Sequence, residues 1–188
     1  MIAEPTVLSP RARAIASAAL QILEREGPEG LTMRRLGDAV GIRAPSLYKH
    51  FPDKAAVEIA LINDGFEQIA ELFELAMANG EGTLVEFAIA YRAFARSHPH
   101  LYRLMTAGPL PRESLRPGVE ARAGAPIVQA VGDPNLARAV WAFAHGMVIL
   151  ELDGRFPADA NLEAAWAAGL AAFGSAEQPD TQRQHSAG

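Results

Sequence analysis

Apolar residues recur at helical spacing along most of the chain, and no stretch alternates apolar and polar residues for long. Between Ile59 and Ala76 they follow one another at intervals of three and four, the period of one face of an α-helix. This stretch predicts one helix of about 25 residues, about 37 Å long at the usual rise. Alanine is abundant while valine and threonine are sparse, which favours an all-α fold over any sheet.

Turn and capping residues divide the chain into about nine helices. Ser9-Pro10 and Asp133-Pro134 each combine an N-cap residue with a proline at the first helical position. Three prolines and two glycines between Thr106 and Gly118 predict a loop. We expect helices at about 10–27, 33–40, 45–51, 54–79, 84–97, 100–105, 119–131, 134–153 and 161–173.

The second and third of these helices form the most informative stretch. Thr32 is a suitable N-cap for the first of them, and Gly41 tolerates a left-handed turn before the second begins at Pro45. The residues that we expect this pair of helices to bury are Met33, Leu36, Val40, Leu47 and Phe51. Two short helices joined by a tight turn, the second presenting polar and basic groups outward, suit insertion into a DNA major groove.

The run from Ile42 to Lys54 resembles the DNA-reading segment of the TetR family of bacterial repressors. The usual pattern there is an aliphatic residue, four variable positions, Leu-Tyr, two residues, Phe, two residues and Lys. This chain matches it at Leu47, Tyr48, Phe51 and Lys54. One departure is Arg43, where the family often has a serine that caps the recognition helix. Arg43 cannot act as this cap, because an arginine side chain cannot accept hydrogen bonds from backbone N–H groups.

The candidate DNA contacts fall into two classes. Phosphate contacts, which position the domain and set its salt dependence, are expected from Thr32, Tyr48, Lys49, His50 and Lys54. Base edges would be reached by Arg43, Ala44, Pro45 and Ser46. Arg34 and Arg35 could contact either backbone or base. The alternative for Tyr48 is a packed core aromatic, and the resemblance favours a phosphate contact instead.

The distribution of charge agrees with a DNA-binding N-terminus. The net charge is −5, which alone argues against nucleic acid. Residues 1–54 nevertheless carry eight Lys or Arg against six Asp or Glu, whereas residues 55–188 carry nine against sixteen. Both lysines of the chain, Lys49 and Lys54, lie in the basic part. A protein that meets phosphates at one end has such a distribution, although ordinary variation between surfaces remains the alternative.

The resemblance implies two domains and a dimer. We expect a three-helix DNA-binding domain at 1–53, a helical regulatory and dimerisation domain at 54–174, and a disordered tail at 175–188. The string from Trp141 to Leu152 resembles one subgroup of TetR-type C-terminal domains, in which Trp, His-Gly and Glu-Leu recur. In the family the last two helices usually form the homodimer interface. The alternative is that they only close the core of their own subunit.

The C-terminal helices are rich in aromatic residues, and the resemblance implies a small-molecule pocket among them. The candidate ligand-binding residues are Phe66, Tyr91, Tyr102, Met105, Trp141 and His145, with Arg92 and Arg96 as anion partners. Aromatic residues at helical spacing also form ordinary cores, so that interpretation stays open for each of them. The resemblance implies a regulator that binds a pseudo-palindromic double-stranded operator as a dimer, usually as a repressor, and that a small-molecule effector of unknown identity releases.

An enzyme is the main alternative class, and the sequence offers no catalytic residues for one. It lacks a Gly-rich phosphate loop, a Gly-x-Ser-x-Gly elbow and a His-Glu-x-x-His motif, and no cofactor is implied. His98 and His100 flank Pro99 without a neighbouring carboxylate, which predicts no metal site. A helical partner-binding adaptor remains the second alternative, with weak, salt-insensitive binding to nucleic acid.

The chain contains no cysteine, so disulfides and thiolate metal sites are excluded. Its most apolar segment, Val140 to Leu150, is interrupted by His145 and is too short to span a bilayer. We therefore expect a cytoplasmic protein without a membrane partner.

Overall fold

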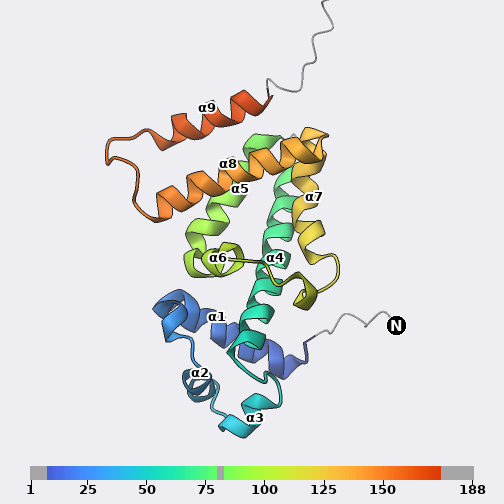
Figure 1. Cartoon of the computed structure of the whole chain (residues 1–188), viewed down its shortest axis with the longest axis vertical. Helices are drawn as coiled ribbons and strands as arrows, with labels where there is room; N and C mark the ends of the chain where they lie inside the picture. The colour runs from blue at the N-terminus through green and yellow to red at the C-terminus, as the bar shows by residue number, and fades with distance from the viewer. Residues whose placement is uncertain (1–7, 80–82, 175–188) are drawn as a thin grey trace, which may run out of the picture. The chain divides into compact units, whose positions relative to one another are not determined.

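The computed structural model describes residues 8–79 and 83–174. Within these residues the fold is helical throughout, with nine α-helices, one 3₁₀ turn and no strand (Figure 1), which confirms the predicted all-α class. The helices are α1 (Pro10–Gly30), α2 (Met33–Ala39), α3 (Ala44–Tyr48), α4 (Lys54–Asn79), α5 (Leu84–Ser97), α6 (Pro99–Thr106), α7 (Val119–Val131), α8 (Pro134–Leu152) and α9 (Leu162–Gly174). The tail predicted at 175–188 lies outside the described residues.

Capping side chains set the helix starts where the sequence predicts them. The hydroxyl of Ser9 accepts a 3.2 Å hydrogen bond from the backbone N–H of Ala12 at the start of α1. A carboxylate oxygen of Asp53 accepts one of 2.8 Å from Ala56 in the first turn of α4. Asp133 and Asn161 act likewise for α8 and α9. Each bond satisfies a backbone donor that the first helical turn leaves free.

Helix α1 runs further than expected. We predicted its end near Gly27, and the helical path does break there, where the backbone has a φ of 71°. A short turn then continues through Pro28 to Gly30. Glycine adopts this left-handed conformation without the steric cost of a side chain, so the break is placed at Gly27.

The chain divides into two compact units. The first comprises Met1–Glu71 and Phe94–Ala123, and the second comprises Leu72–Ala93 and Gly124–Gly188, so α4 takes part in both. Fully buried side chains at the core of the first unit include Ile15, Leu23, Leu36, Leu47, Leu61, Leu101 and Tyr102. Buried side chains at the core of the second unit include Phe73, Phe87, Tyr91, Val140, Val148, Trp166 and Leu170. The division into domains at residue 53 remains a functional prediction.

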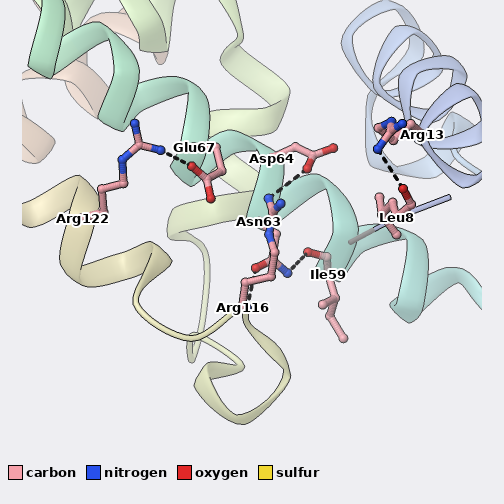
Figure 2. A network of polar contacts seen from close by, with 8 residues as sticks. All are labelled: Leu8, Arg13, Ile59, Asn63, Asp64, Glu67, Arg116 and Arg122. Carbon is pink, nitrogen blue, oxygen red and sulfur yellow. Dashed lines mark hydrogen bonds and ion pairs between the residues drawn. The ribbon is translucent and has the colours of Figure 1, made fainter. Parts of the chain in front are cut away.

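A ladder of polar contacts fixes the segment before and within α7 to α4 in the first unit (Figure 2). Asn63, which is buried, donates to a backbone carbonyl one turn earlier at 2.8 Å and accepts 2.6 Å from the backbone N–H of Arg116. The guanidinium of Arg116 lies 3.0 Å from Asp64, and Arg122 pairs with Glu67. The buried amide therefore has partners for both its donor and its acceptor, as a buried polar group requires.

Helix α1 also holds α6 in the first unit. The carboxylate of Glu24 accepts hydrogen bonds from the backbone N–H groups of Leu101, at 2.8 Å, and His100, at 3.3 Å. The residue at the N-cap of α6, His98, makes no side-chain capping bond. Glu24 thus caps α6 from a distant part of the chain. Among the described residues, no helix is both long enough and apolar enough to cross a membrane.

Candidate nucleic-acid interface

The first helix of the predicted pair forms as expected. Thr32 precedes α2, and its hydroxyl accepts a 3.2 Å hydrogen bond from the backbone N–H of Arg35. Leu36 is fully buried, while Met33 and Val40 are partly buried at the edge of the same face. A turn with Gly41 at a φ of 64° follows. These features confirm the predicted cap, apolar face and left-handed turn.

Helix α3 presents a polar face that buried residues hold in place. Leu47 is completely buried and Phe51 is 3% exposed. The other side of the segment is exposed at Arg43, Ala44, Pro45, Ser46, Tyr48, Lys49 and His50. Tyr48 is 49% exposed, so its ring is not a packed core aromatic. Arg43 stands at the N-cap position without a side-chain cap bond, as its chemistry predicts.

The helix is shorter than the sequence pattern predicts. It ends at Tyr48, so Lys49 and His50 lie in the turn that follows it rather than on the helix. The backbone N–H of His50 bonds to the carbonyl of Leu47 at 2.9 Å, a tightened last turn. Proline at position 52 disfavours helical geometry for Phe51, so the chain cannot continue as a helix beyond this turn.

The cations of this region differ in their partners. Arg35 forms an ion pair with Glu26 of α1. The ammonium of Lys54 donates a 2.8 Å hydrogen bond to the carbonyl of Pro28 and lies 3.5 Å from Glu58. Arg34, Arg43 and Lys49 make no ion pair within the part of the chain that the structure describes. These three are therefore available to phosphates or bases without breaking an intramolecular pair.

Two arginines near the start of α1 serve the fold. Arg11 donates to the carbonyl of Val40, at the end of α2, at 3.3 Å. Arg13 donates to the carbonyl of Leu8 at 2.9 Å (Figure 2). The bond from Arg11 fixes α2 against α1. Arg11 and Val40 are too far apart in sequence for a local pattern to predict their contact. The pairing of Glu26 with Arg35 likewise has no local signal.

Three of the six candidate ligand residues belong to the first unit. Tyr102 and Met105 on α6 are buried, and Phe66 on α4 is partly buried. The sulfur of Met105 lies where a Cβ of Gly65 would be, so the absence of a side chain at Gly65 admits the methionine against α4. The remaining three, Tyr91, Trp141 and His145, belong to the second unit.

Tyr91 stacks on Phe73 at 6.2 Å and lies 5.5 Å from Phe87, between ring centroids, in a buried aromatic cluster. Trp141 is 49% exposed and stacks on His145 at 5.9 Å on α8. Burial lowers the pKa of His145 below its usual value. The assignment of all six residues to a ligand pocket remains a prediction.

Arg92 is occupied by partners of its own unit. Its guanidinium forms ion pairs with Glu151, at 2.9 Å, and with Glu163, at 2.5 Å, and it lies 5.8 Å from the ring centre of Trp166. Burial opposes the charge of Arg92, but hydrogen bonds to Glu163 and Glu151 and the attraction of both carboxylates together raise its pKa. An anionic ligand at Arg92 would therefore have to displace two carboxylates. Arg96, the other predicted anion partner, is exposed.

Two family models match the chain, and the regions they cover agree with this geometry. Residues 15–61 match the model described as bacterial regulatory proteins, tetR family. Residues 84–173 match the model of a tetracyclin repressor-like C-terminal domain. The first match contains α2 and α3 with their connecting turn. The narrower subgroup suggested by the string from Trp141 to Leu152 stays a prediction.

Curated relatives lead to the same family. An uncharacterized HTH-type transcriptional regulator of Mycobacterium tuberculosis is 31% identical over 166 residues, which cover 81% of this chain and 74% of that protein. The class C tetracycline repressor of Escherichia coli is 46% identical over 48 residues, covering 26% of this chain and 22% of the repressor. The similarity to the latter is therefore confined to a short segment.

Solved structures share the fold. A protein of unknown function from Rhodococcus sp. RHA1 has a TM-score of 0.73 at 24% identity, covering 92% of this chain and 98% of its own. A TetR variant of Acinetobacter baumannii AYE in complex with minocycline has a TM-score of 0.54 at 22% identity, covering 89% of this chain and 98% of its own. With the two family models and the mycobacterial relative, these similarities establish that the chain belongs to the TetR family of bacterial DNA-binding transcriptional regulators.

Proposed function

We propose that this chain is a repressor that binds a pseudo-palindromic operator as a homodimer and leaves it when a small-molecule effector binds. The observation that carries the proposal is the exposed face of α3, seated on the buried Leu47 and Phe51. A rigid short helix with outward polar and cationic groups can enter the major groove. Members of this family bind DNA as dimers and bind small ligands.

The exposed residues divide by chemistry into two sets of contacts. Arg43 pairs with guanine, and Ala44 and Pro45 contact thymine methyl groups, while Ser46 bonds to a base edge. Phosphate contacts come from Thr32, Arg34, Tyr48, Lys49, His50 and Lys54. Tyr48 supports this division, because its ring is half exposed and its hydroxyl can reach a phosphate. Arg35 is a further candidate whose charge Glu26 already balances.

Helices α8 and α9 are the proposed dimer interface. Helix α8 exposes Trp141, at 49%, and Leu150, at 41%. Exposed alanines on α9 are Ala164, Ala165, Ala167, Ala168, Ala171 and Ala172. Small residues let two helices approach closely, and grouped exposed apolar side chains are typical of association surfaces. Trp166 and Leu170, by contrast, are buried in their own unit, so part of α9 closes its own core.

The effector site remains assigned to Phe66, Tyr91, Tyr102, Met105, Trp141 and His145. The minocycline complex of the Acinetobacter protein supports a small-molecule ligand for this fold, without identifying the ligand of this chain. In the proposed dimer, an effector can favour a form in which the two α3 helices are wrongly spaced for the operator. The ratio of its affinities for the two forms sets how far it weakens operator binding. Helix α4 takes part in both units and is the candidate element for this coupling.

The dependence of DNA binding on salt distinguishes this function from the alternative of a partner-binding adaptor. The full chain would be titrated into a labelled mixed-sequence duplex between about 50 and 200 mM salt, with the binding followed by fluorescence anisotropy. A regulator should bind measurably at low salt, with an affinity that falls steeply as salt rises. Weak binding that salt does not change would favour the adaptor. Sedimentation of the complex should show two chains per duplex that carries an operator.

A further inference from the structure

We infer that the ion pair with Glu26 keeps Arg35 from contacting DNA phosphates and so limits the affinity of the α2–α3 segment for DNA. This inference rests on the proposed function. Arg35 lies on α2, the helix that crosses the DNA backbone when α3 enters the groove. Its guanidinium is paired with the carboxylate of Glu26 on α1. The side chain of Arg35 is 54% exposed, whereas that of Glu26 is only 23% exposed.

The last turn of α1 holds the acidic partner in place. The helical path breaks at Gly27, directly after Glu26, and the short turn that follows brings Gly30 against Glu26. A Cβ built on Gly30 would overlap the Cβ of Glu26, so this approach requires a residue without a side chain. Glu26 also lies 3.3 Å from the guanidinium of Arg25. The side chain of Glu26 therefore lies against Gly30, close to the start of α2, and is mostly buried.

A pre-formed ion pair changes what Arg35 contributes to DNA binding. Phosphate contacts strengthen binding because each neutralised phosphate releases condensed counterions. Glu26 partly balances the charge of Arg35, and moving Arg35 to a phosphate would leave the carboxylate with only the exposed Arg25 as a partner beside a polyanion. The gain from one contact is thus offset by a new repulsion. Arg34, its neighbour on α2, makes no ion pair among the described residues and contributes its full charge.

The test compares Glu26→Gln with Glu29→Gln as a matched control. Glu29 lies in the same turn, carries the same charge, is exposed and makes no ion pair among the described residues. Glu26→Gln should tighten binding to a mixed-sequence duplex and steepen the salt slope by about 0.9, as for one added phosphate contact. Its advantage over the wild type should then shrink about 3.5-fold between about 50 and 200 mM salt. Glu29→Gln should leave the slope unchanged.

Arg35→Gln, alone and with Glu26→Gln, assigns the effect to the pair. Arg35→Gln alone should show the wild-type salt slope. The double variant should also show the wild-type slope, because the extra phosphate contact of Glu26→Gln requires Arg35. Equal slopes for Glu26→Gln and Glu29→Gln, or a shallower slope for Arg35→Gln alone, would overturn the inference while the proposed function stands. Absence of DNA binding by every variant and by the wild type would overturn the proposed function and the inference together. Circular dichroism melting curves establish that each variant is folded.

Discussion

Trp166 on α9 donates a 2.6 Å hydrogen bond from its indole Nε1 to the Oε1 atom of Glu151 on α8. The other oxygen of the same carboxylate accepts 2.9 Å from Nε of Arg92 on α5. Only 7% of the Glu151 side chain is exposed. One buried carboxylate thus joins three helices of the second unit, including both helices of the proposed dimer interface. The contact satisfies a buried indole donor and balances a buried charge.

Replacing Glu151 with alanine should destabilise the second unit strongly. The change leaves the Trp166 indole and Nε of Arg92 without this partner while Arg92 keeps Glu163, for an expected loss of about 1–3 kcal/mol in unfolding free energy. Urea unfolding followed by circular dichroism measures it. Glu163→Ala is the control, because Glu163 pairs with the same arginine but is 80% exposed, and it should cost about 0–1 kcal/mol. Similar losses in both variants would contradict the structural role of the buried carboxylate.

His145 should make the protein less stable in acid. Burial lowers its pKa below the usual 6.5, so folding favours the neutral ring. Its contribution to stability is fully present above pH 6.5 and is lost as pH falls through the folded-state pKa. In urea unfolding at about pH 7.5 and 5.5, His145→Gln should lose less stability on acidification than the wild type. His50→Gln, at an exposed position, should keep the wild-type difference, and equal behaviour of the two variants would refute the assignment.

Lys54→Ala should weaken binding to all duplexes about equally. Its ammonium donates to an uncharged carbonyl, that of Pro28, and lies 3.5 Å from Glu58, longer than the usual charge-assisted bond. A donor therefore remains for a phosphate, and the salt slope should become shallower by about 0.9 in anisotropy titrations. Glu58→Ala controls for loss of the ion pair alone and should not make the slope shallower.

Arg43→Ala should instead change which sequences are bound. The side chain is exposed at the start of α3 and makes no cap bond, so removing it leaves the fold unchanged. Loss of a bidentate contact to guanine should reduce discrimination at particular base pairs by about 1–3 kcal/mol. Competition between the operator and single-base variants measures this. Equal loss of discrimination in Arg43→Ala and Lys54→Ala would contradict the separation of base from phosphate contacts.

Local signals predicted the helices and the reading face well. Ser9, Thr32 and Asp133 all act as the caps that the sequence suggests, because a cap depends on residues within one turn. The burial of Leu47 follows equally from helical spacing. The end of α3 was misplaced, since the apolar spacing of Leu47 and Phe51 continues past the last helical residue, Tyr48, and Phe51 is buried from outside the helix.

Contacts between distant segments were not predictable from one sequence. Nothing near Glu24 indicates that it caps α6, and nothing near Glu26 indicates that it neutralises Arg35. Arg92, considered as a partner for an anionic ligand, is instead held by two carboxylates from α8 and α9. Such pairs arise only when folding brings helices together, and they decide which of several similar cations remain available to a ligand.

Selection of bound duplexes from a random DNA pool, at two salt concentrations, tests most directly whether α3 reads an operator as part of a dimer. We predict enrichment of an inverted repeat whose half-site centres lie about one helical turn, or a multiple of it, apart. The repeat should persist at the higher salt, because base contacts and not only phosphates distinguish it. Failure to enrich any sequence, with no binding at physiological salt, would contradict the account.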